Sequence, residues 1–161
     1  MSHTPLDVSL REIDSDTVRA VTSLSVAEDQ KRFVASNAVS LAQALFTPEA
    51  WYRAVYLRKE IVGFVMLHDE SLASVLPEKP KIGFWRFMID SKFQGQGIGR
   101  AALNLVIEHA RAKGQFESIE LSYVPGPGCP EPFYLGLGFN HTGRMDDGEV
   151  VLSFKFTKTD A

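Results

Sequence analysis

Residues 86–100, with the sequence RFMIDSKFQGQGIGR, decide the fold of this chain. An apolar run that ends at Ile89 is followed by a polar turn, and then by glycines at positions 95, 97 and 99 that lead into a helical pattern. The first N–H groups of a helix have no partner inside the helix, and the helix dipole adds a partial positive charge there. Glycines let a bulky anion reach the backbone without meeting a Cβ, and Arg100 adds a full positive charge. A pyrophosphate group is the ligand that such a loop fits.

Two nucleotide-binding fingerprints are excluded at this loop. A dinucleotide fingerprint needs its third glycine three residues after the second, and an acidic residue about 20 positions further on. Here the glycines alternate, and the next predicted strand ends at Tyr123 without that acid. A P-loop needs Gly-Lys-Ser/Thr, whereas this loop continues Gly99-Arg100-Ala101. A flexible turn with incidental glycines remains the alternative to an anion site.

Hydrophobic periodicity predicts an alternation of strands and helices on both sides of this loop. Strands are expected at 8–13, 51–58, 61–67, 81–90, 118–123, 139–142 and 150–156, and helices at 18–24, 38–45, 97–113 and 133–137. Asp16 is expected to cap the first helix, Lys59-Glu60 to form the turn between the second and third strands, and Gly114 to end the long helix. This order predicts an α+β fold (an α/β sandwich) in which helices pack on a mostly antiparallel sheet.

Length and composition indicate one ordinary globular domain over residues 1–161, since domains average roughly 150 residues. Seventeen Lys and Arg against twenty Asp and Glu give a net charge of −3, which predicts neither a nucleic-acid partner nor a membrane surface. Cys129 is the one cysteine, so no internal disulfide can form. The N-terminus has no signal-peptide pattern, and the apolar run 61–67 is far shorter than the roughly twenty residues that span a bilayer. We expect a cytoplasmic protein.

Two motifs in this order resemble the signatures of the GNAT acetyltransferases. Gln94-x-x-Gly97-x-Gly99 after an apolar strand is similar to that family's pyrophosphate loop. Residues 133–139, FYLGLGF, are similar to its second signature, a tyrosine on a short helix closed by Gly-Phe. The resemblance extends from about Val8 to Phe156. It implies a mixed, mostly antiparallel sheet that is splayed between strands 4 and 5, with helices on both faces.

The resemblance also implies acetyl-CoA as cosubstrate, bound in the gap between those two strands. The backbone of Phe87, Met88 and Ile89 would then bind the pantetheine arm, and an N–H at the strand end, such as that of Ile89, would polarise the thioester carbonyl. Tyr134 would protonate the departing thiolate. The resemblance assigns the pyrophosphate to the amides of Gln94, Gly95, Gln96, Gly97, Ile98, Gly99 and Arg100.

Other residues near this site receive no role. The family often places an asparagine where this chain has Pro127, so no cofactor contact is assigned to residues 125–130. Direct transfer from acetyl-CoA needs no nucleophilic cysteine, and Cys129 has no evident histidine partner. The four histidines show no ligand spacing, so no metal is expected.

The acceptor amine must lose a proton before it can attack, because an alkyl amine with a pKa of about 10.4 is almost fully protonated at pH 7. Residues 26–30, 33–37 and 85–90 resemble the bacterial spermine/spermidine acetyltransferases of the same family. That resemblance places Glu28 and Asp29 on a loop over the acceptor, and it makes a polyamine the expected small-molecule substrate. A different amine (an amino-acid derivative, an antibiotic or a protein N-terminus) and a non-catalytic acyl-CoA-binding sensor stay open, as does a homodimer.

Overall fold

A computed structural model describes residues 6–33 and 35–157 of the chain. Its seven strands form one sheet in the order β1-β2-β3-β4-β5-β7-β6, which is antiparallel throughout except between β4 and β5. This topology confirms the predicted α+β class. The strands are β1 (Val8–Arg11), β2 (Ala50–Leu57), β3 (Glu60–Asp69), β4 (Ile82–Ile89), β5 (Ser118–Tyr123), β6 (Asn140–Asp146) and β7 (Glu149–Lys155).

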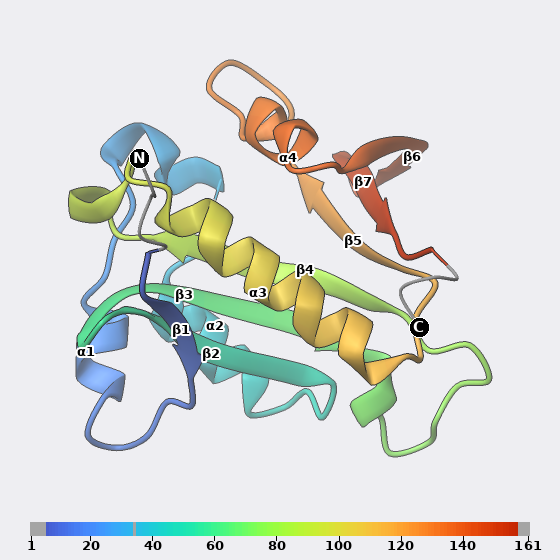
Figure 1. Cartoon of the computed structure of the whole chain (residues 1–161), viewed down its shortest axis with the longest axis horizontal. Coiled ribbons are helices and arrows are strands. Elements are labelled where there is room, and N and C mark those ends of the chain that lie inside the picture. The colour runs from blue at the N-terminus through green and yellow to red at the C-terminus, as the bar shows by residue number, and fades with distance from the viewer. Residues whose placement is uncertain (1–5, 34, 158–161) are drawn as a thin grey trace, which may run out of the picture.

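Helices cover both faces of the sheet, as the resemblance implied (Figure 1). The helix α3 (Ile98–Lys113) crosses the front of β1 to β4 in that view, and α1 (Val18–Thr22) and α2 (Asn37–Ala44) lie behind them. The short α4 (Glu131–Gly136) lies beside the end of β5. Three short 3-10 turns, η1 (Glu28–Phe33), η2 (Glu70–Leu72) and η3 (Ser91–Phe93), complete the elements of the described residues.

The alternation of side chains along β3 divides the core into two layers. Val65 and Leu67 pack with the apolar face of α3 in one cluster, whereas Phe64 and Met66 pack with Val21 of α1 in the other. All four of these β3 side chains are fully buried. The sheet is therefore apolar on both faces where helices cover it, as in other sheets with helices on both sides.

The long helix α3 begins and ends as the sequence predicts. Its buried positions recur at helical spacing, and Gly97 and Gly114 flank it with φ values of +84° and +66°. Glycine adopts such left-handed conformations at no steric cost, so it can stop a helix at either end. None of the helices in the described part of the chain is both long enough and apolar enough to cross a membrane.

Two local predictions were wrong. The turn between β2 and β3 is formed by Arg58 and Lys59 rather than Lys59-Glu60, because a bulge in β3 shifts the register so that Glu60 pairs with Leu57. Arg58 takes the positive φ (+55°) that this tight turn requires.

The turn before α1 is the second correction. The carboxylate of Asp14, not that of Asp16, accepts the free N–H groups there, from Asp16 at 2.9 Å and Thr17 at 3.0 Å. Asp14 lies where an Asx-type turn can form ahead of the helix, and Asp16 itself acts as a donor in that turn.

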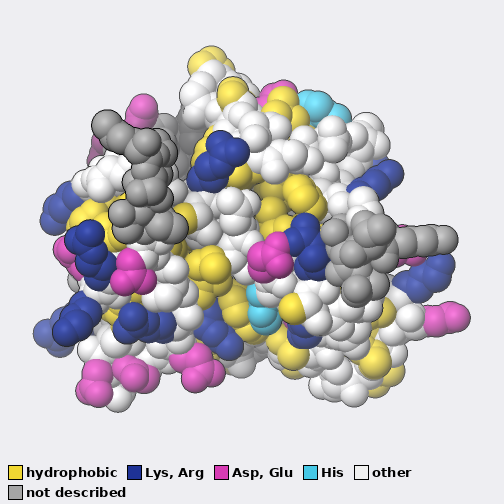
Figure 2. Space-filling model, viewed as in Figure 1, with side chains coloured by type: hydrophobic (Ala, Val, Ile, Leu, Met, Phe, Trp, Pro, Cys, Tyr) yellow, Lys and Arg dark blue, Asp and Glu magenta, His cyan; other side chains and the backbone are white. Residues whose placement is uncertain are grey.

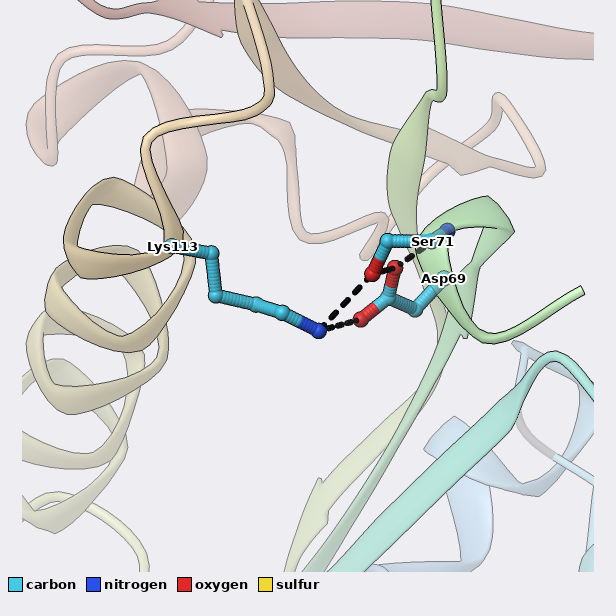
Figure 3. Close-up of polar contacts among 3 residues, drawn as sticks. All are labelled: Asp69, Ser71 and Lys113. Carbon is cyan, nitrogen blue, oxygen red and sulfur yellow. Dashed lines mark hydrogen bonds and ion pairs between the residues drawn. The ribbon is translucent and has the colours of Figure 1, made fainter. Parts of the chain in front are cut away.

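The end of α3 is tied to the end of β3 by a closed triangle of polar groups (Figure 3). The Nζ of Lys113 donates to Oδ2 of Asp69 at 2.7 Å and to the hydroxyl of Ser71 at 2.8 Å. That hydroxyl in turn donates to Oδ1 of Asp69 at 2.6 Å. The Asp69 side chain is fully buried, so these bonds satisfy a carboxylate that has no access to water.

Candidate active site

The sheet opens between β4 and β5. These two parallel strands pair only at Ile82↔Ile119 and Gly83↔Glu120, and then diverge (Figure 1). The cause lies in β4, where Trp85 is an extra residue in the register with β3. A bulge of this kind bends its strand and increases the local twist. The predicted splay between strands 4 and 5 is therefore present, and it begins at the bulge.

The register of β4 decides which backbone groups face the gap. The N–H of Asp90 donates to the carbonyl of Val62 at 2.8 Å, next to the pair Gly63↔Ile89. In an antiparallel ladder this makes Ile89 a non-hydrogen-bonded position toward β3, and Phe87 another, two residues before it. The N–H and C=O groups of Phe87 and Ile89 therefore point into the gap, whereas those of Met88 point toward β3.

The loop after β4 is held in place by two side chains. The buried carboxylate of Asp90 accepts from the N–H groups of Lys92 at 3.0 Å and Ser25 at 2.9 Å. The amide of Gln94 donates to the carbonyl of Ile89 at 2.9 Å and to the side chain of Gln30 at 2.9 Å. The glycine loop is thereby fixed against the end of the open strand.

The first turn of α3 faces a cavity of about 440 Å³. Gly97 at the start of α3 supplies no side-chain cap, so the first N–H groups of the helix have no intrahelical partner. A Cβ on Gly99 would meet the Phe133 ring at 3.4 Å, an ordinary van der Waals contact, so the glycine leaves this part of the wall slightly wider. The cavity wall includes Phe87, Met88, Ile89, Gln94, Gly95, Gly97, Gly99 and Arg100 from the predicted set. Gln96 is outside that wall, and the Ile98 side chain is buried in the core.

Tyr134 lies where this cavity meets a second one. The second cavity, of about 540 Å³, shares Phe87, Pro130 and Tyr134 with the first. Burial raises the pKa of Tyr134 to about 12, so its phenol stays protonated at neutral pH. Among the residues that the structure describes, none hydrogen-bonds to this hydroxyl, which leaves its proton available to a ligand.

Charged groups in the wall of the second cavity come from three different elements: Lys31 of η1, Arg86 of β4 and Glu149 of β7. Burial lowers the pKa of the Arg86 guanidinium, and the negative charge of Glu149 partly offsets this effect. Arg86 donates to its neighbour's carbonyl, Trp85 O, at 2.9 Å and to the Gln43 side chain of α2 at 3.3 Å. The sequence assigns no role in the site to Arg86 or Glu149.

Of these two residues, only Arg86 could have been recognised from the sequence as unusual. Arg86 interrupts an otherwise apolar strand, and a charge at such a position is unusual unless it has a partner. Glu149 follows a turn and resembles any surface glutamate. Only the pairing of β7 with β5 brings it to the gap.

The predicted acceptor residues Glu28 and Asp29 are absent from the walls of both cavities. The Glu28 side chain is 88% exposed and pairs with Lys31 at 2.8 Å. Lys31 does line the second cavity, so Glu28 pairs with a residue of the wall without being part of the wall itself.

Two further groups were considered as site residues. Cys129 is half-buried in the wall of the first cavity and is not paired with another cysteine. Within residues 6–33 and 35–157, no three histidine, cysteine, aspartate or glutamate side chains gather in a way that could hold a metal ion. On the face shown in Figure 2, acidic and basic side chains are interspersed.

Comparison with known proteins gives consistent results. The model of the acetyltransferase (GNAT) family matches residues 11–130. A relative named spermine/spermidine N(1)-acetyltransferase, from Bacillus subtilis (strain 168), is 28% identical over 153 residues, which cover 91% of this chain and 97% of that protein.

Solved structures share the architecture at lower sequence identity. The GNAT domain of S. lividans PAT has a TM-score of 0.69 and 17% identity, with 92% of this chain and 89% of that chain covered. The PaiA N-acetyltransferase from Thermoplasma acidophilum, solved in complex with coenzyme A, has a TM-score of 0.66 and 13% identity, with coverage of 92% and 99%. At these identities the likeness establishes the fold.

Proposed function

Because the chain belongs to the acetyltransferase (GNAT) family, we propose that it transfers the acetyl group of acetyl-CoA directly to a primary amine of a polyamine. N-acetyltransferase activity and an amine acceptor follow from the family. The identity of the amine, the ternary complex and the roles of individual residues are our proposal. In this proposal residues 1–161 act as one catalytic domain.

One observation carries the proposal: two cavities meet at Phe87 and Tyr134, on either side of the open end of the sheet. Direct transfer requires a donor and an acceptor to be held together at one point, so that the amine can attack without a covalent enzyme intermediate. The cavity next to the glycine loop suits the donor, and the cavity next to Arg86 and Glu149 suits the acceptor.

The residues of the donor cavity fit acetyl-CoA. The open N-terminus of α3 and Arg100 offer N–H groups and charge to a pyrophosphate, and Gly99 leaves room for it. The exposed edge of β4 offers the N–H groups of Phe87 and Ile89 and the C=O of Phe87 to the amides of a pantetheine arm, whereas the Ile89 carbonyl already accepts from Gln94. When bound, acetyl-CoA supplies an activated thioester carbonyl.

Two groups on the protein assist the chemistry. The N–H of Ile89 points into the gap, where it can hydrogen-bond the thioester oxygen as negative charge develops on it. The phenol of Tyr134 donates its proton to the sulfur as the carbon–sulfur bond breaks. Since a pKa of about 12 exceeds the value of about 8.5 for an ordinary thiol, this transfer is favourable only if Tyr134 regains a proton from the newly acylated nitrogen in the same step. The ammonium's other lost proton goes to solvent, so each acetyl transfer releases one proton in total.

The polyamine assignment rests mainly on the relatives, because the wall of the acceptor cavity carries two positive side chains, Lys31 and Arg86, beside its carboxylate. The Bacillus subtilis relative named for spermine and spermidine matches nearly its full length. The acceptor cavity also has a carboxylate, Glu149, in its wall. Glu28 and Asp29 stay in the proposal as charges near the entrance, next to Lys31, and not as cavity residues.

Release of free thiol from acetyl-CoA tests the proposal, with spermidine, spermine, putrescine, lysine and an aminoglycoside as parallel acceptors. We expect turnover with the polyamines. Tyr134→Phe should lower kcat about 100-fold or more, within the usual range for a lost general acid, and leave the Kd of acetyl-CoA within about twofold. Tyr52→Phe on β2, outside the walls of both cavities, is the matched control because it removes the same hydroxyl group. Turnover by Tyr134→Phe at the wild-type rate would refute the acid role, and bound acetyl-CoA without turnover for any amine would favour a sensor.

A further inference from the structure

Side chains from both faces of the sheet line the acceptor cavity. Ile119, Leu121 and Tyr123 of β5 belong to the core cluster on the α3 face. Because side chains alternate along a strand, Ser122 points to the opposite face. Glu149 is on that side as well, since its carboxylate Oε1 accepts from the Ser122 hydroxyl at 3.2 Å.

Glu149 is the single carboxylate among the described residues that line this cavity. Its Oε1 is oriented by Ser122, and none of the residues within 6–33 and 35–157 hydrogen-bonds to its Oε2. Glu149 therefore offers a cation one free, oriented carboxylate oxygen. Tyr134 lines the same cavity.

Neither of the two positive side chains in the wall forms a direct pair with Glu149, although the Nε of Arg86 is buried without a hydrogen-bond partner among the described residues. Lys31 pairs with Glu28 at 2.8 Å on the surface. The Nη groups of Arg86 donate to the Trp85 carbonyl and to the Gln43 side chain of α2. Arg86 therefore interacts with Glu149 only electrostatically, without a direct contact. Glu149 thus faces a positive charge that does not bind it directly, and an incoming ammonium can supply the missing direct partner.

We propose that Glu149 is the specificity-determining carboxylate that binds the ammonium group of the acceptor, with Ser122 orienting it and Arg86 opposing any further positive charge at the same place. This inference rests on the proposed function, because it assigns the acceptor to the second cavity. A polyamine would place its reacting end between Glu149 and Tyr134.

The first experiment compares Glu149→Gln with wild type in steady-state kinetics and in binding. The amide keeps the shape and can still accept from Ser122, but it loses the negative charge. We expect the KM for spermidine to rise at least tenfold while the KM for acetyl-CoA stays within twofold. A role limited to folding would change both constants or neither. An unchanged KM for spermidine would overturn the proposal.

Glu120→Gln is the matched control. Glu120 lies on β5 two residues before Ser122, on the same face, and pairs with Arg144 outside the acceptor cavity. The Glu120→Gln variant removes one negative charge from a strand next to β7, just as Glu149→Gln removes one from β7. We expect the KM for spermidine and the KM for acetyl-CoA to stay within twofold of wild type.

Arg86→Gln tests the sign of the electrostatic argument. Removal of the opposing charge should lower the KM for spermidine about threefold. A rise in the KM for spermidine would show that Arg86 does not oppose the ammonium group of the acceptor, which would overturn this part of the proposal.

Calorimetric titration of spermidine into the protein saturated with coenzyme A separates this inference from the proposed function. Binding by wild type that Glu149→Gln weakens tenfold supports the role of Glu149, even if no thiol is released and the transfer proposal fails. No binding of spermidine to wild type would overturn the role of Glu149, whatever amine proves to be acetylated.

Discussion

The two ends of α3 both carry a glycine, but the first end is open to a cavity and the last end is anchored to the sheet. Each end has a glycine with positive φ, Gly97 at the start and Gly114 after the last residue. At the start the free N–H groups face the donor cavity, and within the described part of the chain no side chain caps them. At the other end the Gly114 N–H bonds back to Arg111, and Lys113 binds the buried Asp69.

This difference indicates how the first N–H groups of α3 can remain without hydrogen-bond partners while the helix itself stays rigid. The 16 residues of α3 span about 24 Å, so its last turn is far from the pyrophosphate loop. The helix is one rigid element, and anchoring its far end holds the open N–H groups in a fixed direction. Loss of the anchor should therefore reduce stability, whereas changes at the open end should reduce affinity.

The largest expected effect comes from the anchor. Asp69→Asn leaves Lys113 without its partner in a mostly buried site, which should cost about 3 kcal/mol of unfolding free energy at pH 7. Urea denaturation measures the change, and Asp7→Asn on the surface serves as the control. Acetyl-CoA affinity of the folded protein should stay within twofold. If fully folded Asp69→Asn bound acetyl-CoA much more weakly, the anchored end of α3 would also determine affinity, which would contradict our interpretation.

The same anchor has a predictable pH range. Burial by itself would raise the pKa of Asp69, but hydrogen bonds from Lys113 and Ser71 outweigh this and lower the pKa below its usual 3.8. A depressed carboxyl pKa contributes stability above the pKa of the unfolded chain and loses it as pH falls further. The contribution of Asp69 should thus be complete at pH 5 and should decline only below about pH 3.8.

The second effect concerns the open end. Gly97→Ala forces an L side chain into a conformation with φ near +84°, so the first turn of α3 must rearrange. We expect the Kd of acetyl-CoA to rise at least tenfold, equal to about 1.4 kcal/mol, by calorimetry. Gly114→Ala imposes comparable strain at the anchored end, where a Cβ meets no atom within 4 Å. It should cost about 1 kcal/mol of stability and leave affinity unchanged, so equal losses of affinity in the two variants would refute the argument.

The open end was the part that the sequence predicted best. The alternating glycines and the periodic apolar residues of α3 are local signals, and both the helix and the position of the loop were correct. The short α4 places the tyrosine of the second signature, Tyr134, in the wall of the donor cavity, and its catalytic role stays a prediction. At the glycine loop, α3 and α4, the hydrophobic pattern and the family motifs indicate the same elements.

The anchor and the acceptor cavity were not predicted, and the reason is physical. Periodicity reports which face of an element is apolar, but it does not say which polar groups meet across the fold. The predicted strand 61–67 stops short of Asp69, whereas Asp69 ends β3 and bonds to a lysine 44 residues later. Glu149 reaches the cavity only because β7 inserts between β5 and β6. Charged residues in the first half, such as Glu28, looked equally suitable on composition alone.

The smallest predicted effect is a pH dependence near the anchored end. His109 lies one turn before Lys113 on α3, stacks on Trp51 at a ring distance of 4.3 Å, and has a buried Nε2 with no partner among the described residues. Burial lowers its pKa below the usual 6.5, and the positive charges of Lys113 and Arg53 add to this, against an opposing effect from Asp69. The unfolded chain therefore binds more protons than the folded one below pH 6.5, and stability must fall as pH decreases from there.

We expect the wild type to lose about 1 kcal/mol more than His109→Phe between pH 7 and pH 5 in urea denaturation, because phenylalanine keeps the stacked ring but cannot titrate. His68→Gln, on the exposed side of β3, should follow the wild-type dependence. Acetyl-CoA affinity at pH 7 should be equal in all three proteins, since His109 lies far along α3 from the open end. If His109→Phe kept the wild-type pH dependence, the imidazole would be able to charge inside the folded protein, and the anchored end would be more open to water than its contacts indicate.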